Sequence, residues 1–88
     1  MKVVFFPTAW DDYILLSETE ERLFVKVNRL IAESRRDPFR GTGKPEALRG
    51  NLSGWWSRRI DREHRLVYRV AGSGVTQALE IAQCRFHY

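Results

Sequence analysis

The sequence predicts an α+β fold in which two N-terminal helices pack on one face of a small, mainly antiparallel β-sheet. Three observations support this prediction. A short run of β-branched and aromatic residues, "KVVFF" at 2–6, opens the chain, and two stretches with apolar side chains at helical spacing follow it. Strand-like runs separated by polar turns then fill residues 55–86. Because the chain has 88 residues, we expect a single domain, 1–88.

The first helix is predicted directly after the opening strand. Pro7 ends the strand, and Thr8 with Asp11 three positions later has the pattern of an N-cap with an acidic partner. We expect this helix to turn its large apolar side chains inward, namely Trp10, Tyr13, Ile14 and Leu16.

The second helix is predicted from "SETEE" (17–21) to about Arg36. Acids in its first turn and arginines near its end agree with the direction of the helix dipole. Its apolar residues recur at helical spacing and form one stripe: Leu23, Phe24, Val27, Leu30 and Ile31. We therefore expect this stripe to lie in the core. Neither helix shows an evident catalytic pattern.

An irregular segment is predicted at 37–54, which holds four of the six glycines and two of the three prolines. Such segments often display functional side chains on a rigid scaffold. The strand-like runs that follow are "WWSRRI" (55–60), "RLVYRV" (65–70) and a long last strand, "VTQALEIAQCRF" (75–86). The opening strand joins the same sheet, and a central position for the last strand would hold the chain end still.

The composition indicates an anionic partner. The net charge of +4 is uneven, since residues 1–34 carry four basic and six acidic side chains and residues 35–88 carry eleven and five. Twelve of the fifteen basic residues are arginine, whose planar fork matches phosphate groups. An ordinary solvated basic surface is the alternative. One cysteine and no long apolar run indicate a cytoplasmic protein without disulfide or membrane segment.

Alternation along the strands predicts which arginines share a face. If Ile60 and Leu66 face the helices, then Arg59, Arg65 and Arg69 lie together on the opposite face, beside Trp55 and Ser57. On the last strand, Cys84 and Phe86 would enter the core, and Arg85 and His87 would join the arginine face. The alternative is an ordinary sheet surface, where the arginines pair with Asp61, Glu63 and Glu80.

An arginine face could support cleavage of RNA without a metal ion, because the 2′-hydroxyl of the substrate supplies the nucleophile. Such a reaction needs a general base, a general acid and fixed cations for the phosphorane charge. Glu46 is the only acid between Asp37 and Asp61 and is a candidate base, His87 is a candidate acid, and Arg65 would face the phosphate. We expect a turn or hydrogen-bonding role for His64. No metal-ligand spacing or nucleotide-binding loop is visible, and we expect no cofactor. This reasoning leads to an arginine-rich nucleic-acid binder, with a metal-free ribonuclease as one alternative.

A family resemblance goes further. The motifs "GKPE.L", "NLSG.WSRRI", "EHRLVY" and the ending "CRFHY" occur in this order, and "AWDDY" and "RRDPFRGTGKPE" extend the match over nearly the whole chain. In these motifs the sequence resembles the YoeB toxins, in the wider RelE/ParE group of type II toxin–antitoxin systems. The resemblance implies the RelE-like microbial RNase fold and a ribosome-dependent endoribonuclease that cuts mRNA in the 30S A site. It also implies a YefM-like antitoxin and, in many relatives, a homodimer.

The resemblance also implies roles for individual residues. Glu46 matches the general base, Arg65 the residue that stabilises the transition state, and His87 the general acid. The residues that match substrate-binding positions are Arg49, Arg59 and the final aromatic residue, Tyr88. Two alternatives stay open: a ParE-like inhibitor of DNA gyrase, and a non-catalytic RNA- or ribosome-binding module.

Overall fold

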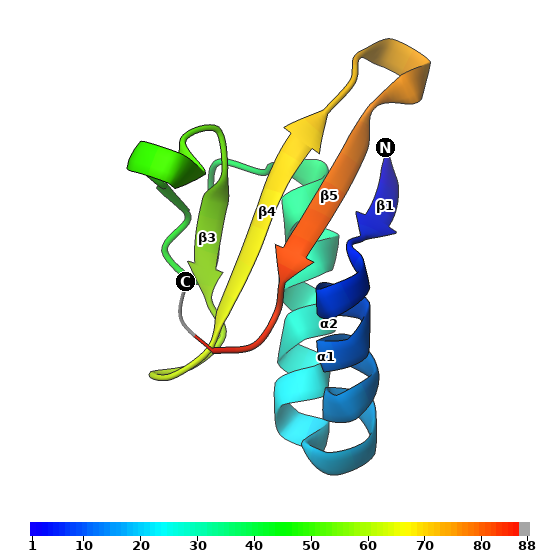
Figure 1. Ribbon diagram of the computed structural model, residues 1–88, viewed down its shortest axis with the longest axis vertical. Coiled ribbons are helices and arrows are strands. Elements are labelled where there is room, and N and C mark those ends of the chain that lie inside the picture. Colours follow the sequence, from blue (N-terminus) through cyan, green and yellow to red (C-terminus); the bar gives the residue numbers. More distant parts are fainter. Residues whose placement is uncertain (87–88) are drawn as a thin grey trace.

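A computed structural model of the chain describes residues 1–86, in which two helices accompany a five-stranded sheet (Figure 1). The elements follow in the order β1 (Lys2–Phe5), α1 (Pro7–Thr19), α2 (Glu21–Arg36), β2 (Glu46–Ala47), β3 (Trp56–Arg59), β4 (Arg65–Ala71) and β5 (Ala78–Gln83). Short 3₁₀ turns lie at Gly50–Leu52 and Gly74–Thr76. The predicted α+β class is confirmed.

The strands lie in the order β1-β5-β4-β3-β2, and every neighbouring pair is antiparallel except β1 with β5. The last strand is therefore interior, with β1 on one side and β4 on the other (Figure 1). A register shift between β4 and β5 leaves Ala82 without a partner, because Tyr68 pairs with Ile81 and Val67 pairs with Gln83. Pairing with β4 thus holds β5 up to Gln83, and pairing with β1 holds it up to Ile81.

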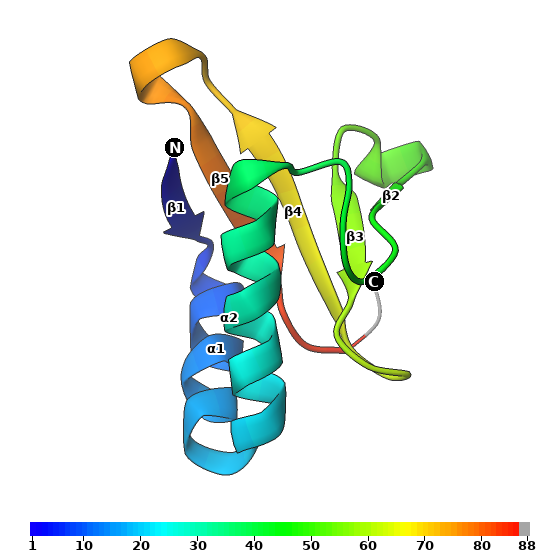
Figure 2. The same cartoon turned by 180° about the vertical axis from the view of Figure 1, so that it is seen from behind.

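The helices form an antiparallel pair, and α2 lies over β4 and β5 on the back of the sheet (Figure 2). The stripe predicted on the second helix is confirmed, since Val27, Leu30 and Ile31 are buried and Leu23 and Phe24 pack against them. The sheet residues of this core come from β4 and β5: Leu66, Tyr68, Leu79 and Ile81. Within residues 1–86, neither helix is both long and apolar enough to cross a membrane.

The predicted start of the first helix is wrong by two residues. The N-cap is Phe6, in extended conformation, and Pro7 is the first helical residue. Proline suits this position because its fixed φ is helical and its missing N–H has no partner there anyway. Thr8 is therefore already inside the helix.

The predicted inward face of the first helix is only partly correct. Leu16 is buried together with the small Ala9, and Tyr13 is half-buried, but Trp10 and Ile14 are 48% and 39% exposed. The ring of Trp10 instead stacks on Tyr13 and meets Phe5 edge-on at the surface. Ala9 lets α1 approach β5 more closely than a large side chain would.

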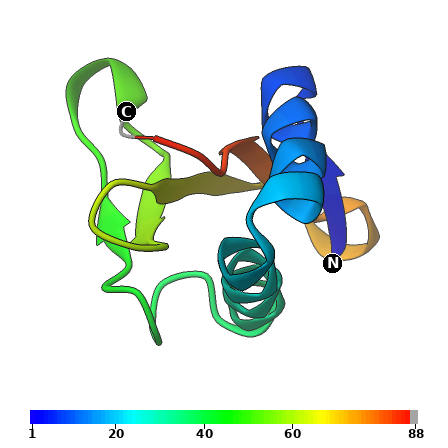
Figure 3. The ribbon, with the colours of Figure 1, turned by 90° about the horizontal axis from the view of Figure 1, so that it is seen from below.

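The last strand is shorter than predicted. It ends at Gln83, and residues 84–86 form a bend that runs on the side of β4 away from α2, toward β3 (Figures 1 and 3). Cys84 enters the core as expected, but Phe86 is 47% exposed and has a φ of +62°. The expectation that Phe86 packs in the core is therefore wrong.

Candidate active site

Three of the candidate residues share the sheet face opposite the helices. Glu46 lies directly across from Ser57, and Arg59 lies across from Arg65. Residues across from each other point to the same face, and diagonal neighbours lie about 7–8 Å apart. Glu46, Arg59 and Arg65 therefore surround Ser57, whose own side chain is buried. The prediction that Arg59 and Arg65 share a face is confirmed.

Arg65 is held by one edge of its guanidinium group. Its Nη1 donates to the carbonyl oxygens of Asp61 at 2.7 Å and His64 at 3.0 Å, both in the turn before β4. Within the described residues, no acceptor engages its Nε or Nη2. The side chain is thus fixed in direction while two of its nitrogens are available for an anion.

Arg69 lies beside Trp55 on the same face as Arg65, as predicted, but it is not an available cation. Its Nε donates to Glu80 at 2.7 Å, and its guanidinium lies 4.4 Å from the centre of the Trp55 ring. The carboxylate neutralises this arginine and the ring covers it. The expected alternative of ion pairing with acids of the sheet is therefore correct for Arg69, while Arg59 and Arg65 form no ion pair within residues 1–86.

Arg85 also departs from its predicted place on the arginine face. Its guanidinium lies 4.3 Å from the centre of the Phe86 ring. It is also near Asp12 of α1. Burial raises the pKa of the Asp12 carboxyl, and the positive charge of Arg85 offsets only part of this rise. Because the strand ends at Gln83, the alternation of strand faces no longer applies to Arg85.

Glu46 is exposed at the start of β2 and follows an irregular loop. The sequence predicted no contact that would hold this loop in place. Arg58, a β3 residue that is fully buried, holds this loop. Its Nη2 donates to the carbonyls of Asp37 at 2.6 Å and Arg40 at 2.8 Å, and its Nη1 donates to Thr42 at 3.1 Å. Three backbone carbonyls of residues 37–42 thus converge on one guanidinium.

A tyrosine completes this arrangement from β4. The Tyr68 hydroxyl accepts from Nε of Arg58 at 3.0 Å and donates to the carbonyl of Pro38 at 2.6 Å. The backbone N–H of Arg59 then donates to the carbonyl of Gly43 at 2.6 Å, three residues before Glu46. Strand alternation could have indicated Arg58, because it places this arginine on the core face with Trp56 and Ile60.

Phe86 lies next to Arg65. The backbone N–H of Arg65 donates to the carbonyl of Phe86 at 3.0 Å, so the last described residue lies beside the start of β4. The candidate acid His87 and the candidate substrate-binding residue Tyr88 lie outside the described residues. Arg49, the remaining candidate, is exposed at the beginning of the 3₁₀ turn that follows β2.

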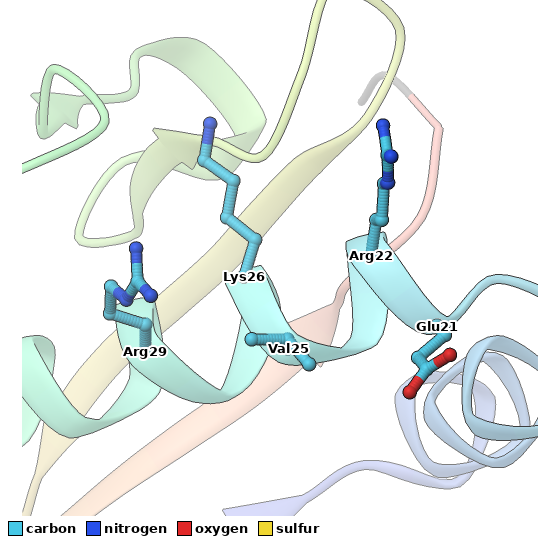
Figure 4. Close-up of a pocket in the computed structure, with 5 residues that line it drawn as sticks. All are labelled: Glu21, Arg22, Val25, Lys26 and Arg29. Carbon is cyan, nitrogen blue, oxygen red and sulfur yellow. The ribbon is translucent and has the colours of Figure 1, made fainter.

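A surface hollow of about 470 Å³ adjoins this face and is lined by Lys26, Arg59, Asp61, Arg62 and Arg65. Burial acts to raise the pKa of Asp61, but hydrogen bonds from the backbone N–H groups of His64 and Glu63 lower it on balance. Lys26 comes from α2, a helix to which the sequence assigned no functional residue. Figure 4 shows Arg22 and Lys26 extending to the same side of α2, one turn apart. The basic surface therefore continues from the sheet onto this helix.

Within residues 1–86, no group of three or more His, Cys, Asp or Glu side chains is arranged to hold a metal ion.

Comparison with known proteins identifies the family. Residues 5–88 match the family model of the YoeB-like toxins of bacterial type II toxin–antitoxin systems. The chain belongs to this family. Toxin YoeB of Escherichia coli K12 is 52% identical over 88 residues, covering both chains completely. A YoeB/ParE toxin from Agrobacterium tumefaciens superimposes with a TM-score of 0.96 at 55% identity, also over both full chains. YoeB from Staphylococcus aureus, solved in a heterotetrameric YoeB–YefM complex, has a TM-score of 0.87 at 38% identity and covers 100% of this chain and 98% of its own.

Proposed function

We propose that this YoeB-family toxin is a ribosome-dependent endoribonuclease that cuts mRNA in the ribosomal A site and so stops translation in the cytoplasm. The main support is the sheet register that gathers Glu46, Arg59 and Arg65 on one open face, with Phe86 beside Arg65. Family membership adds to this support, because the motifs that carry the resemblance supply these same residues.

In the proposed reaction the substrate supplies its own nucleophile. Glu46 removes the proton of a 2′-hydroxyl, whose oxygen attacks the adjacent phosphorus. His87 gives a proton to the departing 5′-oxygen, so that the products are a 2′,3′-cyclic phosphate and a 5′-hydroxyl end. Arg65 stabilises the negative charge that develops on the phosphorane oxygens. Among residues 1–86, nothing accepts a hydrogen bond from its Nε or Nη2, which suits this role.

Arg49, Arg59 and Tyr88 are proposed to hold the RNA. Arg49 and Arg59 are exposed and both follow Glu46 in the chain, so phosphate groups can approach both. Tyr88 would offer an aromatic ring on which a base can stack, a contact worth about 1–3 kcal/mol where such rings have been truncated.

The proposed protein partner is a YefM-like antitoxin, since the S. aureus relative was solved in a YoeB–YefM complex. A cationic face is a natural target for an acidic segment that folds on binding. We expect the antitoxin to cover Arg59 and Arg65 or to displace the end of the chain. The S. aureus relative was also solved as a dimer, and we propose a homodimer for this toxin. Protection from hydrogen exchange confined to the helical face would contradict this mode of inhibition.

The decisive experiment is mapping of 5′ ends of mRNA after induction of the toxin in growing cells. Wild-type protein should create new 5′ ends at fixed positions within codons of translated messages, and Glu46→Ala should abolish them at equal protein level. Gyrase supercoiling assays with the same two proteins test the ParE-like alternative. Inhibition of gyrase without new mRNA ends would overturn the proposal, and so would ribosome binding without cleavage.

A further inference from the structure

The bend that leads to the terminal histidine is held by an imidazole that the proposed chemistry does not use. His64 lies in the turn between β3 and β4, and its side chain is buried, with 9% of the residue exposed. Its Nδ1 accepts a hydrogen bond from the backbone N–H of Phe86 at 2.8 Å. The two rings also contact each other, with centroids 5.4 Å apart.

Phe86 needs this support because its backbone conformation is unfavourable. Its φ of +62° lies in the left-handed region, which is unfavourable for a non-glycine residue and persists only where the surroundings enforce it. Two further hydrogen bonds hold the same residue. The carbonyl of Phe86 accepts from the backbone N–H of Arg65 at 3.0 Å and from Nε2 of Gln83 at 2.8 Å. Only the bond from Phe86 N–H to His64 depends on a side chain that lies outside the chain's last strand and bend.

The anchor itself is rigid. The backbone N–H of His64 donates to Oδ1 of Asp61 at 2.7 Å, and its carbonyl accepts from Nη1 of Arg65 at 3.0 Å and from Ile60 N–H at 3.0 Å. Since Nδ1 acts as the acceptor, the ring hydrogen is on Nε2, 3.9 Å from the Glu63 carboxylate. His64 therefore connects two segments: the turn that orients Arg65 and the bend at Phe86.

We propose that His64 is a positioning residue for the proposed general acid His87: it locks the backbone of Phe86, the residue before His87, beside Arg65. This inference rests on the proposed nuclease function. Holding a catalytic group in place matters because a misplacement of about 1 Å can cost roughly 10²-fold in rate. His64 thus links the two ends of the proposed reaction, the residue that stabilises charge and the residue that donates the proton.

Three substitutions separate the hydrogen bond from simple filling of space. His64→Leu removes the acceptor. His64→Asn places an amide oxygen where Nδ1 is, whereas His64→Gln places it near the position of Nε2. We expect His64→Leu and His64→Gln to lower the single-turnover cleavage rate on programmed ribosomes by roughly 10²-fold with KM unchanged. His64→Asn should restore most of the rate. Hydrogen exchange of the Phe86 amide should be fast in the first two variants and protected in the third.

Double mutants test whether His64 acts through His87. In a His87→Ala background, His64→Leu should cause no further loss of rate, because the group that it positions is absent. In a Glu46→Ala background, the full effect of His64→Leu should persist. Thermal unfolding of each protein selects an assay temperature at which all variants are folded. Equal rates for His64→Leu and wild type, or equal losses in the His87→Ala and wild-type backgrounds, would overturn the inference. If His87→Ala itself leaves cleavage unchanged, the proposed function fails instead.

Discussion

Replacing Arg58 by methionine should destabilise the fold far more than the same change at the adjacent Arg59. Arg58 is fully buried, and its four hydrogen bonds hold three backbone carbonyls and the Tyr68 hydroxyl. A buried ion pair can sometimes be replaced by apolar side chains without loss, because both partners are removed together. Here the acceptors are mostly backbone carbonyls, which no substitution removes. Arg58→Met therefore leaves them without a donor.

The expected size follows from this one-sided loss. Leaving one buried acceptor unpaired costs about 1–3 kcal/mol, so removing the donor of four hydrogen bonds should cost at least about 3 kcal/mol. A domain of this length has a total stability near the lower end of about 5–15 kcal/mol, so the variant should be barely folded at 37 °C. The midpoint of thermal unfolding should fall by at least about 12 °C, since each kcal/mol shifts it by about 4–8 °C in small domains.

Urea unfolding followed by tryptophan fluorescence measures this effect, with Arg59→Met as the matched control. Arg59 is exposed, and surface changes of this kind usually stay within about 0.5 kcal/mol. Tyr68→Phe should give an intermediate loss of about 1–3 kcal/mol, because it leaves Pro38 O and Nε of Arg58 unpaired. Equal stability of Arg58→Met and Arg59→Met would refute the reasoning.

Three further predictions concern catalysis, binding and the buried thiol. Glu46→Gln should lose roughly 10²–10⁴-fold in single-turnover cleavage while ribosome binding persists, and unchanged toxicity would contradict its assignment as the base. Lys26→Glu should raise KM for ribosomes and weaken the dependence of KM on salt. The control Arg36→Glu, at the other end of α2, should do neither. Equal effects of the two changes would argue against a basic surface centred on the hollow. Burial raises the pKa of the Cys84 thiol from 9.0 to about 12, so its stabilising contribution is complete below pH 9 and is lost as the pH rises through 12. Thiol-reactive dye at pH 8 should accordingly label Cys84 at the rate of unfolding, and rapid labelling of folded protein would show that the thiol is accessible.

The parts of the fold that sequence predicts well are those with a clear period. The apolar stripe of α2 recurs at helical spacing, and the alternation in "RLVYRV" correctly places Leu66 and Tyr68 in the core that packs on the helices, to which Arg65 and Val67 do not belong. In both cases burial of one face dominates the free energy, so a pattern of residue types is enough to predict the packing. The same rule brought Arg59 and Arg65 together correctly.

Prediction fails where a tertiary contact overrides a local pattern. Alternation along "AQCRF" predicts a strand to Phe86, but the bulge at Ala82 and the hydrogen bonds to Phe86 turn the chain after Gln83. Similarly, the charge of Arg69 predicts an available cation, while Glu80 across the ladder neutralises it. These outcomes depend on partners distant in sequence, which no short window contains.

The two buried polar residues that sequence reasoning left without a specific partner, Arg58 and His64, serve the same purpose at opposite sides of the proposed site. The candidate base follows an irregular loop and the candidate acid follows a bend, so neither is placed by a long strand. Loops usually have more freedom than strands, yet general acid–base catalysis needs both groups within hydrogen-bond reach of the same substrate. Arg58 fixes the loop through the carbonyls of Asp37, Arg40 and Thr42, and His64 fixes the bend through one N–H. Both anchors come from the β3–β4 hairpin, which also carries Arg65. A single hairpin therefore carries Arg65 and anchors both the loop before Glu46 and the bend at Phe86, which is how so small a core can support a site assembled from irregular segments.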